Sequence, residues 1–410
     1  MRAFLLRTVL PAAGFVLSVA ACSIFSDSKF GDEGGGDPSS SGASSGSFGG
    51  GGDGGKPFVC SPDKKNAEIP DNGCDDDADG QIDNKPTPCD GSISGSSATD
   101  FARAIGVCDQ AAGGKGYGLV KAEFTRGFGR NDAPQAEQHG VLPKFGNVVK
   151  PREGSKLGVL STGYAREFNG PSGNEPFGGE AILGGGGVSY GKDWYNFGRP
   201  APGKPGNGTL PPGFPKAASG CEQADTTNDV INLRLTIKAP PNATGIKFDF
   251  NFYSGEWPAY ICSQFNDGFI AYLTSGGKGD NISFDSKKNP VSVNNGFFDR
   301  CTPSVETGCG EGAKKGTSEC PGGPSELAGT GFGVSGKWCS VYQGGGNQTS
   351  VNGGATGWLT SQAPIVPGEE FTIEFLLWDT GDAILDSSVL IDNFTWASGQ
   401  VTTSTGRPPK

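Results

Sequence analysis

Residues 230–252 read VINLRLTIKAPPNATGIKFDFNF, and this stretch decides the fold class. Apolar and polar residues alternate over 230–238 and again over 246–252. Alternation with a period of two gives a strand one buried and one wet face, as antiparallel sheets have. The Pro-Pro-Asn link at 240–242 is too short for a crossover helix and predicts a turn. We therefore expect consecutive β-strands joined by a turn.

The surrounding sequence extends this β pattern. Residues 371–378 begin with the same alternation, while 184–220 and 302–357 are rich in glycine and proline and read as loops. We expect an all-β protein: an antiparallel two-sheet β-sandwich or jelly roll with long Gly/Pro-rich loops, beginning near residue 145. One short helix is expected at 97–105, upstream of the strands.

The first 26 residues carry an export signal. Arg2 and Arg7 precede a mostly apolar run at 10–19, which is shorter than the ~20 residues that a membrane span needs. The small residues before Cys22, in Val-Ala-Ala-Cys, are those that a lipoprotein signal peptidase requires. We expect cleavage after 1–21 and lipidation of Cys22, with an ordinary signal peptide as the alternative. Ser23 after the cysteine resembles bacterial lipoproteins sorted to the outer membrane of a Gram-negative envelope.

Composition divides the mature chain. Residues 22–56, beginning with the lipidated cysteine, are dominated by Gly, Ser and Asp, which bury too little apolar surface to offset the entropy of ordering. We expect a disordered tether there, holding the folded part off the membrane. A Cys-rich acidic unit at 57–95, a β domain at 96–398 and a disordered tail at 399–410 follow.

Cysteine use agrees with an exported protein. The chain has 11 cysteines, and lipidation of one leaves an even number, which predicts up to five disulfides of open connectivity. The disulfide candidates are Cys60, Cys74, Cys89, Cys108, Cys221, Cys262, Cys301, Cys309, Cys320 and Cys339. Since no CxxC pair occurs and His139 is the one histidine, the sequence argues against a structural zinc site.

The charge of the chain excludes some partners. The formal net charge is −11, and removal of Arg2 and Arg7 with the signal leaves it near −13. This acidic balance argues against nucleic acid or an anionic lipid surface as partner, and it suits a cation-binding exported protein.

An acidic loop at 71–83 reads DNGCDDDADGQID. Its last nine residues, from Asp75 to Asp83, match the first nine positions of an EF-hand loop. Alternating carboxylates curl around one hard cation, Gly80 makes the sharp turn, and a backbone carbonyl serves at the seventh position. The expected Ca²⁺ ligands are Asp75, Asp77, Asp79, Gln81 and Asp83. Pro86 stands where an EF-hand has its bidentate Glu. A solvated acidic turn beside a disulfide is the alternative. The loop resembles the DDDxDGxxD metal-binding motif of exported bacterial proteins and thrombospondin type 3 calcium repeats.

Three further segments carry a family resemblance. They are LGVLSTG at 157–163, FYSGEWP with QFNDGF within 252–269, and WDTGDAILDSSVLID at 378–392. In order and spacing they resemble the choice-of-anchor L domain family over about residues 100–398, although Gly255 replaces the first Glu of the usual pair. The resemblance implies a surface module that the organism fastens to the cell, here through Cys22. It implies no enzymatic activity.

These segments also hold acidic residues in two loops. Their side chains would meet if the sheets bring the loops together, and repulsion would then require a cation or an arginine. The residues of this second candidate Ca²⁺ site are Glu256, Asp267, Asp379, Asp382 and Asp386. Loop acids that are solvated or bonded to backbone N–H groups are the alternative.

Catalytic motifs are weak. A Ser-His-Asp arrangement would need His139, which lies in a polar, turn-rich stretch and is expected to be solvated. The Gly-x-Ser-x-Gly matches at 42–46 and 187–191 lack the strand–turn–helix context of a nucleophile elbow. No pair of carboxylates is selected for glycoside hydrolysis. We therefore expect no enzyme.

Aromatic residues in or beside the loops offer another class of function. They are Trp194, Tyr195, Trp257, Tyr260 and Trp358. Such rings stack on sugars when exposed and otherwise seal the ends of a sandwich core. We expect a non-catalytic, lipid-anchored cell-surface module for adhesion, contacting a matrix protein or surface glycan. The alternative is a carbohydrate-binding surface protein, and an exported hydrolase is less favoured.

Overall fold

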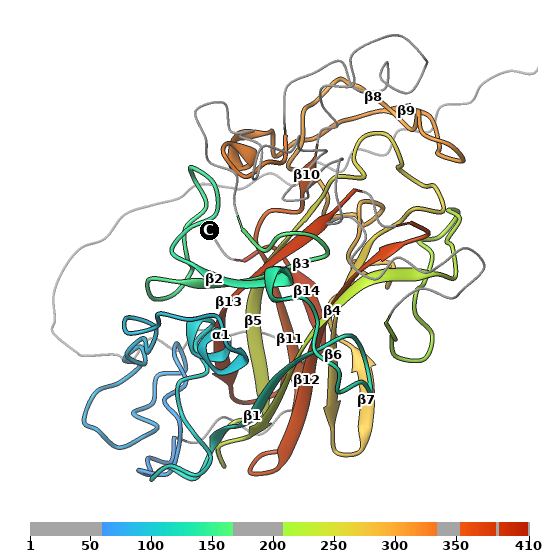
Figure 1. Ribbon diagram of the computed structural model, residues 1–410. Helices are drawn as coiled ribbons and strands as arrows, with labels where there is room; N and C mark the ends of the chain where they lie inside the picture. The colour runs from blue at the N-terminus through green and yellow to red at the C-terminus, as the bar shows by residue number, and fades with distance from the viewer. Residues whose placement is uncertain (1–59, 167–207, 334–352, 383–384, 409–410) are drawn as a thin grey trace, which may run out of the picture. The chain divides into compact units, whose positions relative to one another are not determined.

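The computed structural model describes residues 60–166, 208–333, 353–382 and 385–408, all within the unit Gly55–Lys410 (Figure 1). The predictions for the signal peptide, Cys22, the tether, Trp194, Tyr195 and Cys339 lie outside these ranges. The regular structure is almost entirely β, as predicted. Among the described helices, none has the length and apolar content required to span a bilayer.

The first sheet has five antiparallel strands in the order β1-β4-β12-β6-β7. Its strands are β1 (Gly118–Thr125), β4 (Thr227–Lys238), β12 (Glu370–Thr380), β6 (Gly268–Ser275) and β7 (Lys278–Asn281). Strands β4 and β12 pair with each other in the interior of this sheet, and they contain the alternating runs at 230–238 and 371–378.

The second sheet has seven strands in the order β14-β11-β5-β13-β3-β2, with β10 paired to β5. Its strands are β14 (Ser404–Gly406), β11 (Leu359–Pro364), β5 (Gly245–Ser254), β13 (Ser387–Ala397), β3 (Leu157–Ser161), β2 (His139–Leu142) and β10 (Gly354–Ala355). A separate hairpin joins β8 (Glu306–Thr307) to β9 (Gly316–Thr317).

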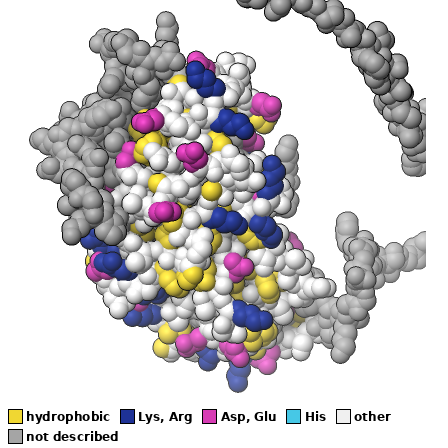
Figure 2. All heavy atoms as spheres, turned by 90° about the vertical axis from the view of Figure 1, so that its right-hand side faces the viewer, with side chains coloured by type: hydrophobic (Ala, Val, Ile, Leu, Met, Phe, Trp, Pro, Cys, Tyr) yellow, Lys and Arg dark blue, Asp and Glu magenta, His cyan; other side chains and the backbone are white. Residues whose placement is uncertain are grey.

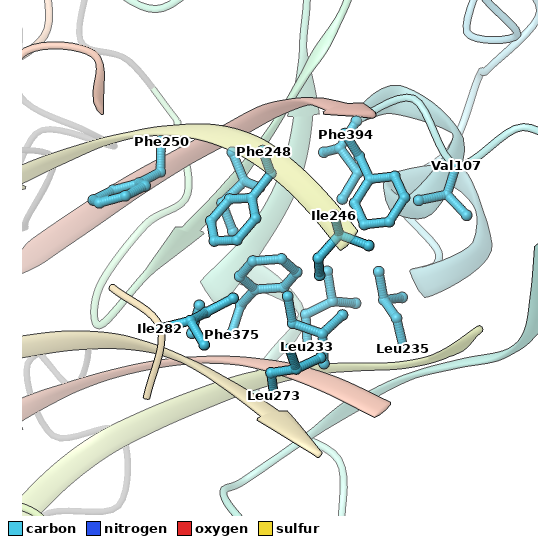
Figure 3. Packing of buried hydrophobic residues seen from close by; sticks show 14 of the residues in the cluster. Val107, Leu233, Leu235, Ile246, Phe248, Phe250, Leu273, Ile282, Phe375 and Phe394 are labelled. Carbon is cyan, nitrogen blue, oxygen red and sulfur yellow. The ribbon is translucent and has the colours of Figure 1, made fainter. Parts of the chain in front are cut away.

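The two sheets pack face to face around an aromatic core. Strands β4 and β5, joined by the predicted turn, lie in different sheets and place their apolar residues on facing surfaces. Figure 3 shows Ile246 and Phe248 of β5 opposite Leu233 and Phe375 of the first sheet. The rings of Phe248 and Phe375 meet edge to face with centroids 5.0 Å apart. This packing confirms the predicted sandwich.

Strand β5 has no wet face over most of its length, contrary to the simple alternation rule. On the side away from the main core, Tyr253 packs with Phe145, Leu327 and Phe332 in a second buried cluster. The loops that carry these residues cover the outer surface of the second sheet. The polar Asn251 is buried there and donates to the hydroxyl of Tyr253.

The predicted helix is confirmed as α1 (Ala98–Ala104). The hydroxyl of its N-cap residue, Ser97, accepts a hydrogen bond from Asp100 N. Phe101 enters the main core and passes so close to β3 that a Cβ at Gly158 would lie 2.2 Å from its ring. A glycine is therefore needed at this crossing.

Three local predictions are wrong. Strands β1 and β2 precede residue 145, the expected start of the β region. Residues 404–406 of the expected disordered tail form β14, because β11 offers them an open sheet edge. His139 is half-buried in β2 and stacks on Phe124 at 3.8 Å, rather than standing in solvent.

The described residues show four of the up to five predicted disulfides, whose pairing the sequence left open. They are Cys60–Cys74, Cys89–Cys108, Cys221–Cys262 and Cys301–Cys320. Cys309 is disulfide-bonded as well. The second bridge crosses the boundary expected at residue 95 and ties the Cys-rich unit to the segment after α1.

Candidate cation sites

Strand ends from both sheets meet at one place in the sandwich and bring acidic side chains together there. Glu256 follows β5, Asp267 precedes β6, Asp379 lies at the end of β12, and Asp386 precedes β13. Each is no more than 2% exposed. We call these four residues the end cluster. All four were predicted from the sequence, and the half-buried Asp382 lies close enough for its charge to act on two of them.

A register shift in the first sheet accompanies Asp379. Leu377 pairs with Ile231, whereas Asp379 pairs with Asn228, so two residues of β4 lie opposite one of β12. One of these two, Asp229, has a positive φ of 48° and is buried. Such a bulge re-aims side chains at the end of a ladder.

Asp267 links the two sheets. Its Oδ1 accepts a hydrogen bond from Thr380 N of the first sheet at 3.1 Å, and its Oδ2 accepts one from Ser387 Oγ of the second sheet at 2.7 Å. Asp386 has room for its carboxylate because residue 163 is glycine: a Cβ there would lie 2.2 Å from Asp386 Oδ2. The glycine of the LGVLSTG segment thus shapes the cluster.

Several buried oxygens of this region receive no hydrogen bond from the described residues. They are Glu256 Oε2, both carboxylate oxygens of Asp379, and Asn228 Oδ1. No described Lys or Arg forms an ion pair with Glu256, Asp267 or Asp379. Since burying an ionised carboxylate without a partner costs several kcal/mol, these groups need protons or a cation.

The electrostatics of the cluster agree with this requirement. Burial raises the pKa of Asp267 to about 7. Burial, followed by the charges of Asp267 and Asp382, raises the pKa of Glu256 well above its usual value. Burial, followed by the charges of Asp267, Asp386 and Asp229, does the same to the pKa of Asp379. The carboxyl groups of Asp267 and Asp379 also lie within hydrogen-bonding reach, so one proton or one cation must separate them.

The donor set fits a hard cation. The end cluster offers carboxylate oxygens, with an amide oxygen from Asn228, and Ca²⁺ takes six to eight oxygen ligands in flexible geometry. The carboxylate oxygens of the end cluster are, however, spaced more widely than those of a preformed metal site. Among the described residues, three acids with oxygens within 4.8 Å of one another occur only at the acidic loop.

Sequence reasoning missed Asn228 and Asp229 at the start of β4. They are the second and third residues of β4, whereas Asp267 and Asp386 each stand directly before a strand, so all four lie where a strand begins. This shared position is the signal that could have found them.

The acidic loop is held by hydrogen bonds between its own carboxylates and its backbone. Asp75 accepts hydrogen bonds from Asp79 N at 3.1 Å and Gly80 N at 3.0 Å. Asp83 accepts one from Asn72 N at 2.9 Å, and Asp79 accepts one from Gln81 N at 2.8 Å. The loop therefore closes on its own backbone through the acids that were expected to bind Ca²⁺.

The compact group of three acids differs from the predicted set. It contains Asp75 and Asp77 with Glu68, a residue from outside the motif, whereas Asp79, Gln81 and Asp83 are not part of it. No spacing rule for EF-hand loops points to Glu68, which lies seven residues before the first ligand position.

The aromatic residues considered for sugar stacking and the histidine take structural positions. Trp257 is 2% exposed and packs with Val293 and the Cys301–Cys320 bridge, so it is no open surface for a sugar. Tyr260 and Trp358 are half-buried. Burial lowers the pKa of His139, which keeps the ring neutral against Phe124.

The raised pKa values predict a calcium response that depends on pH. The folded-state pKa values of Glu256, Asp267 and Asp379 exceed their unfolded values, so the folded chain holds more protons and loses stability as pH rises through about 7. Ca²⁺ binds the ionised groups and offsets this loss. We expect the calcium-induced increase in melting temperature to be larger near pH 8 than near pH 5.5, by scanning calorimetry with Ca²⁺ and with EDTA. Any effect of His139 on the melting temperature is the same with Ca²⁺ and with EDTA, so it cancels when one melting temperature is subtracted from the other. Equal calcium-induced increases at both pH values would contradict the prediction.

Comparison with known proteins adds a family match. The sequence of residues 216–395 matches the family model of the Choice-of-anchor L domain, and this range includes all four residues of the end cluster. No curated protein matches the chain. A solved structure of the carbohydrate-binding module TmCBM61 in complex with beta-1,4-galactotriose aligns over 68% of this chain and 90% of that chain, with 6% identity. Its TM-score of 0.23 is too low to support an argument about fold or ligand. The family match supports a Choice-of-anchor L domain in this chain, over a shorter span than the sequence resemblance.

Proposed function

We propose that the protein is a lipid-anchored, non-catalytic module of the cell surface whose binding end is held in shape by a buried Ca²⁺ ion. The observation that carries this proposal is the end cluster. Glu256, Asp267, Asp379 and Asp386 lie between two sheets, and oxygens of Glu256 and Asp379 lack a hydrogen-bond donor among the described residues.

The topology gives such an ion a clear mechanical role. The chain passes from the second sheet to the first between β5 and β6, and from the first back to the second between β12 and β13. Glu256 and Asp267 flank the first crossing, and Asp379 and Asp386 flank the second. One cation held by these side chains would supply the positive charge that the site lacks and clamp both crossings together.

A disulfide and two hydrogen bonds to Asp267 already tie these loops to their surroundings. The Cys221–Cys262 disulfide ties the first crossing to the segment before β4, and Asp267 ties both sheets through Thr380 and Ser387. A cation would complete this set. The loops at this end would then present a fixed surface to a partner outside the cell, which we take to be a matrix protein.

Several observations support an exported, surface-associated location. Disulfides form and persist in oxidising compartments, and the described residues contain four complete bridges. The family match suggests a surface module. Figure 2 shows one face on which acidic and basic side chains are interspersed, which is typical of a solvated surface. The lipobox at Cys22 supplies the proposed anchor.

Chemistry at the described residues does not favour catalysis. His139 is stacked and neutral, with no described serine or cysteine nucleophile hydrogen-bonded to it. The buried position of Trp257 removes one of the aromatic residues on which glycan binding would depend. A glycan array probed with the full chain separates the two binding classes, and specific retention of a sugar would replace the matrix-protein proposal.

Substitution of the end cluster should remove part of the calcium response. Asp379→Asn and Glu256→Gln delete a negative charge with little change in shape, so we expect an equal or higher melting temperature in EDTA. We also expect the loss of about 5 °C of the calcium-induced increase, which corresponds to roughly 2–3 kcal/mol of binding. Scanning fluorimetry of the full chain in detergent measures both.

Asp392→Asn is the matched control for this experiment. Asp392 is equally buried in the sandwich, but its carboxylate accepts hydrogen bonds from Arg152 N and Asn393 N. This variant should melt at a different temperature and keep the full calcium response. The proposal fails if all three variants retain that response.

Loss of the anchor should release the protein from the membrane. The variant Cys22→Ser lacks the thiol that would carry the lipid, so we expect the chain in the soluble fraction of lysed cells. Incorporation of a clickable fatty acid into the parent, and not into the variant, provides the control. Retention of the variant in the membrane pellet would disprove the lipid anchor.

A further inference from the structure

Glu68 is a buried carboxylate placed directly beside the acidic loop. The residue is 6% exposed. One oxygen, Oε2, accepts hydrogen bonds from Asp76 N at 2.9 Å and Asp77 N at 3.4 Å. The other, Oε1, is buried and receives no hydrogen bond from the described residues. Half of this carboxylate thus fixes the loop backbone, and the other half is left for a ligand.

Asp75 and Asp77 lie beside the carboxylate of Glu68. One oxygen from each of the three acids lies within 4.8 Å of the others. Ligand oxygens at 2.3–2.6 Å from a Ca²⁺ ion can be no more than about 5 Å apart, so the three fit around one ion. Asp77 Oδ1 is a second buried oxygen without a described donor, while its Oδ2 lies 3.9 Å from Lys115 Nζ.

We infer that Glu68 binds Ca²⁺ together with Asp75 and Asp77, and replaces the glutamate that the acidic loop lacks at its twelfth position. In an EF-hand this glutamate closes the site from the C-terminal side of the loop. Here Pro86 occupies that position, and Glu68 closes the site from the N-terminal side. The neighbouring Cys74 is bonded to Cys60, so no thiolate is available and the donors are all oxygen.

The position of Glu68 connects this site to the sandwich. The preceding residue, Ala67, exchanges two hydrogen bonds of 3.0 Å and 2.8 Å with the side chain of Asn242, in the turn between β4 and β5. The following residue, Ile69, belongs to the main core. A cation on Glu68 would therefore fasten the acidic loop to the folded domain, in addition to the hydrogen bonds and the disulfide that already hold the loop.

Calcium titration of the full chain in detergent, by isothermal calorimetry, tests this inference. Glu68→Gln keeps the shape and an acceptor for Asp76 N but removes the charge. We expect it to lose one equivalent of bound Ca²⁺ or to bind that equivalent about tenfold or more weakly. Asp71→Asn is the control, because Asp71 is an exposed acid of the same loop whose positive φ of 64° suits asparagine. Unchanged binding in Glu68→Gln, or equal losses in both variants, would overturn the inference.

Hydrogen exchange of the unsubstituted chain gives a second test that does not depend on how a variant folds. Peptides covering 68–83 should exchange more slowly in Ca²⁺ than in EDTA, and equal exchange would also overturn the inference. The acidic-loop site shares no residue with the end cluster. Asp379→Asn should therefore keep this protection, so failure of one proposal is distinguishable from failure of the other.

Discussion

Repulsion between carboxylates buried where the two sheets meet is the constraint on which one end of this sandwich depends. Two unit charges 4 Å apart interact by about 4 kcal/mol at the effective dielectric constant of a protein, and a whole domain is stable by only about 5–15 kcal/mol. Glu256, Asp267 and Asp379 are buried, near one another and without a described basic partner. The folded state can tolerate these groups only if protons or a cation reduce their charge. The proposed Ca²⁺ ion meets this need and joins the two sheets.

The rest of the fold explains why the acids meet. The edge-to-face contact of Phe248 with Phe375 belongs to a core that holds β5 against the first sheet. Once the sheets are packed, the crossings from β5 to β6 and from β12 to β13 must turn at the same end. Apolar packing thus positions the loops, and the side chains at the strand ends determine what the loops can bind. Packing against the domain also positions the ligand residue of the acidic loop. Glu68 lies between Ala67, which is hydrogen-bonded to Asn242, and Ile69, which belongs to the main core.

The parts of the structure with a local cause could be predicted from the sequence. Strands β4, β5 and β12 show their alternation, and Ser97 marks the start of α1. Strand β14 could not be predicted, because it exists through pairing with β11 and not through its own pattern. The second buried face of β5 was equally hidden, since distant loops cover it. For the sites, the acids within each motif were found, whereas Asp229 and Glu68 come from elsewhere in the chain and become neighbours only on folding.

A crystal structure of the full chain grown with Ca²⁺ is the most direct test of the central claim. The account predicts an anomalous scatterer within the end cluster, with carboxylate oxygens of Glu256, Asp267 and Asp379 at about 2.3–2.6 Å. An end cluster without such a scatterer, in which Asp267 and Asp379 share a proton through a short oxygen–oxygen contact, would contradict it.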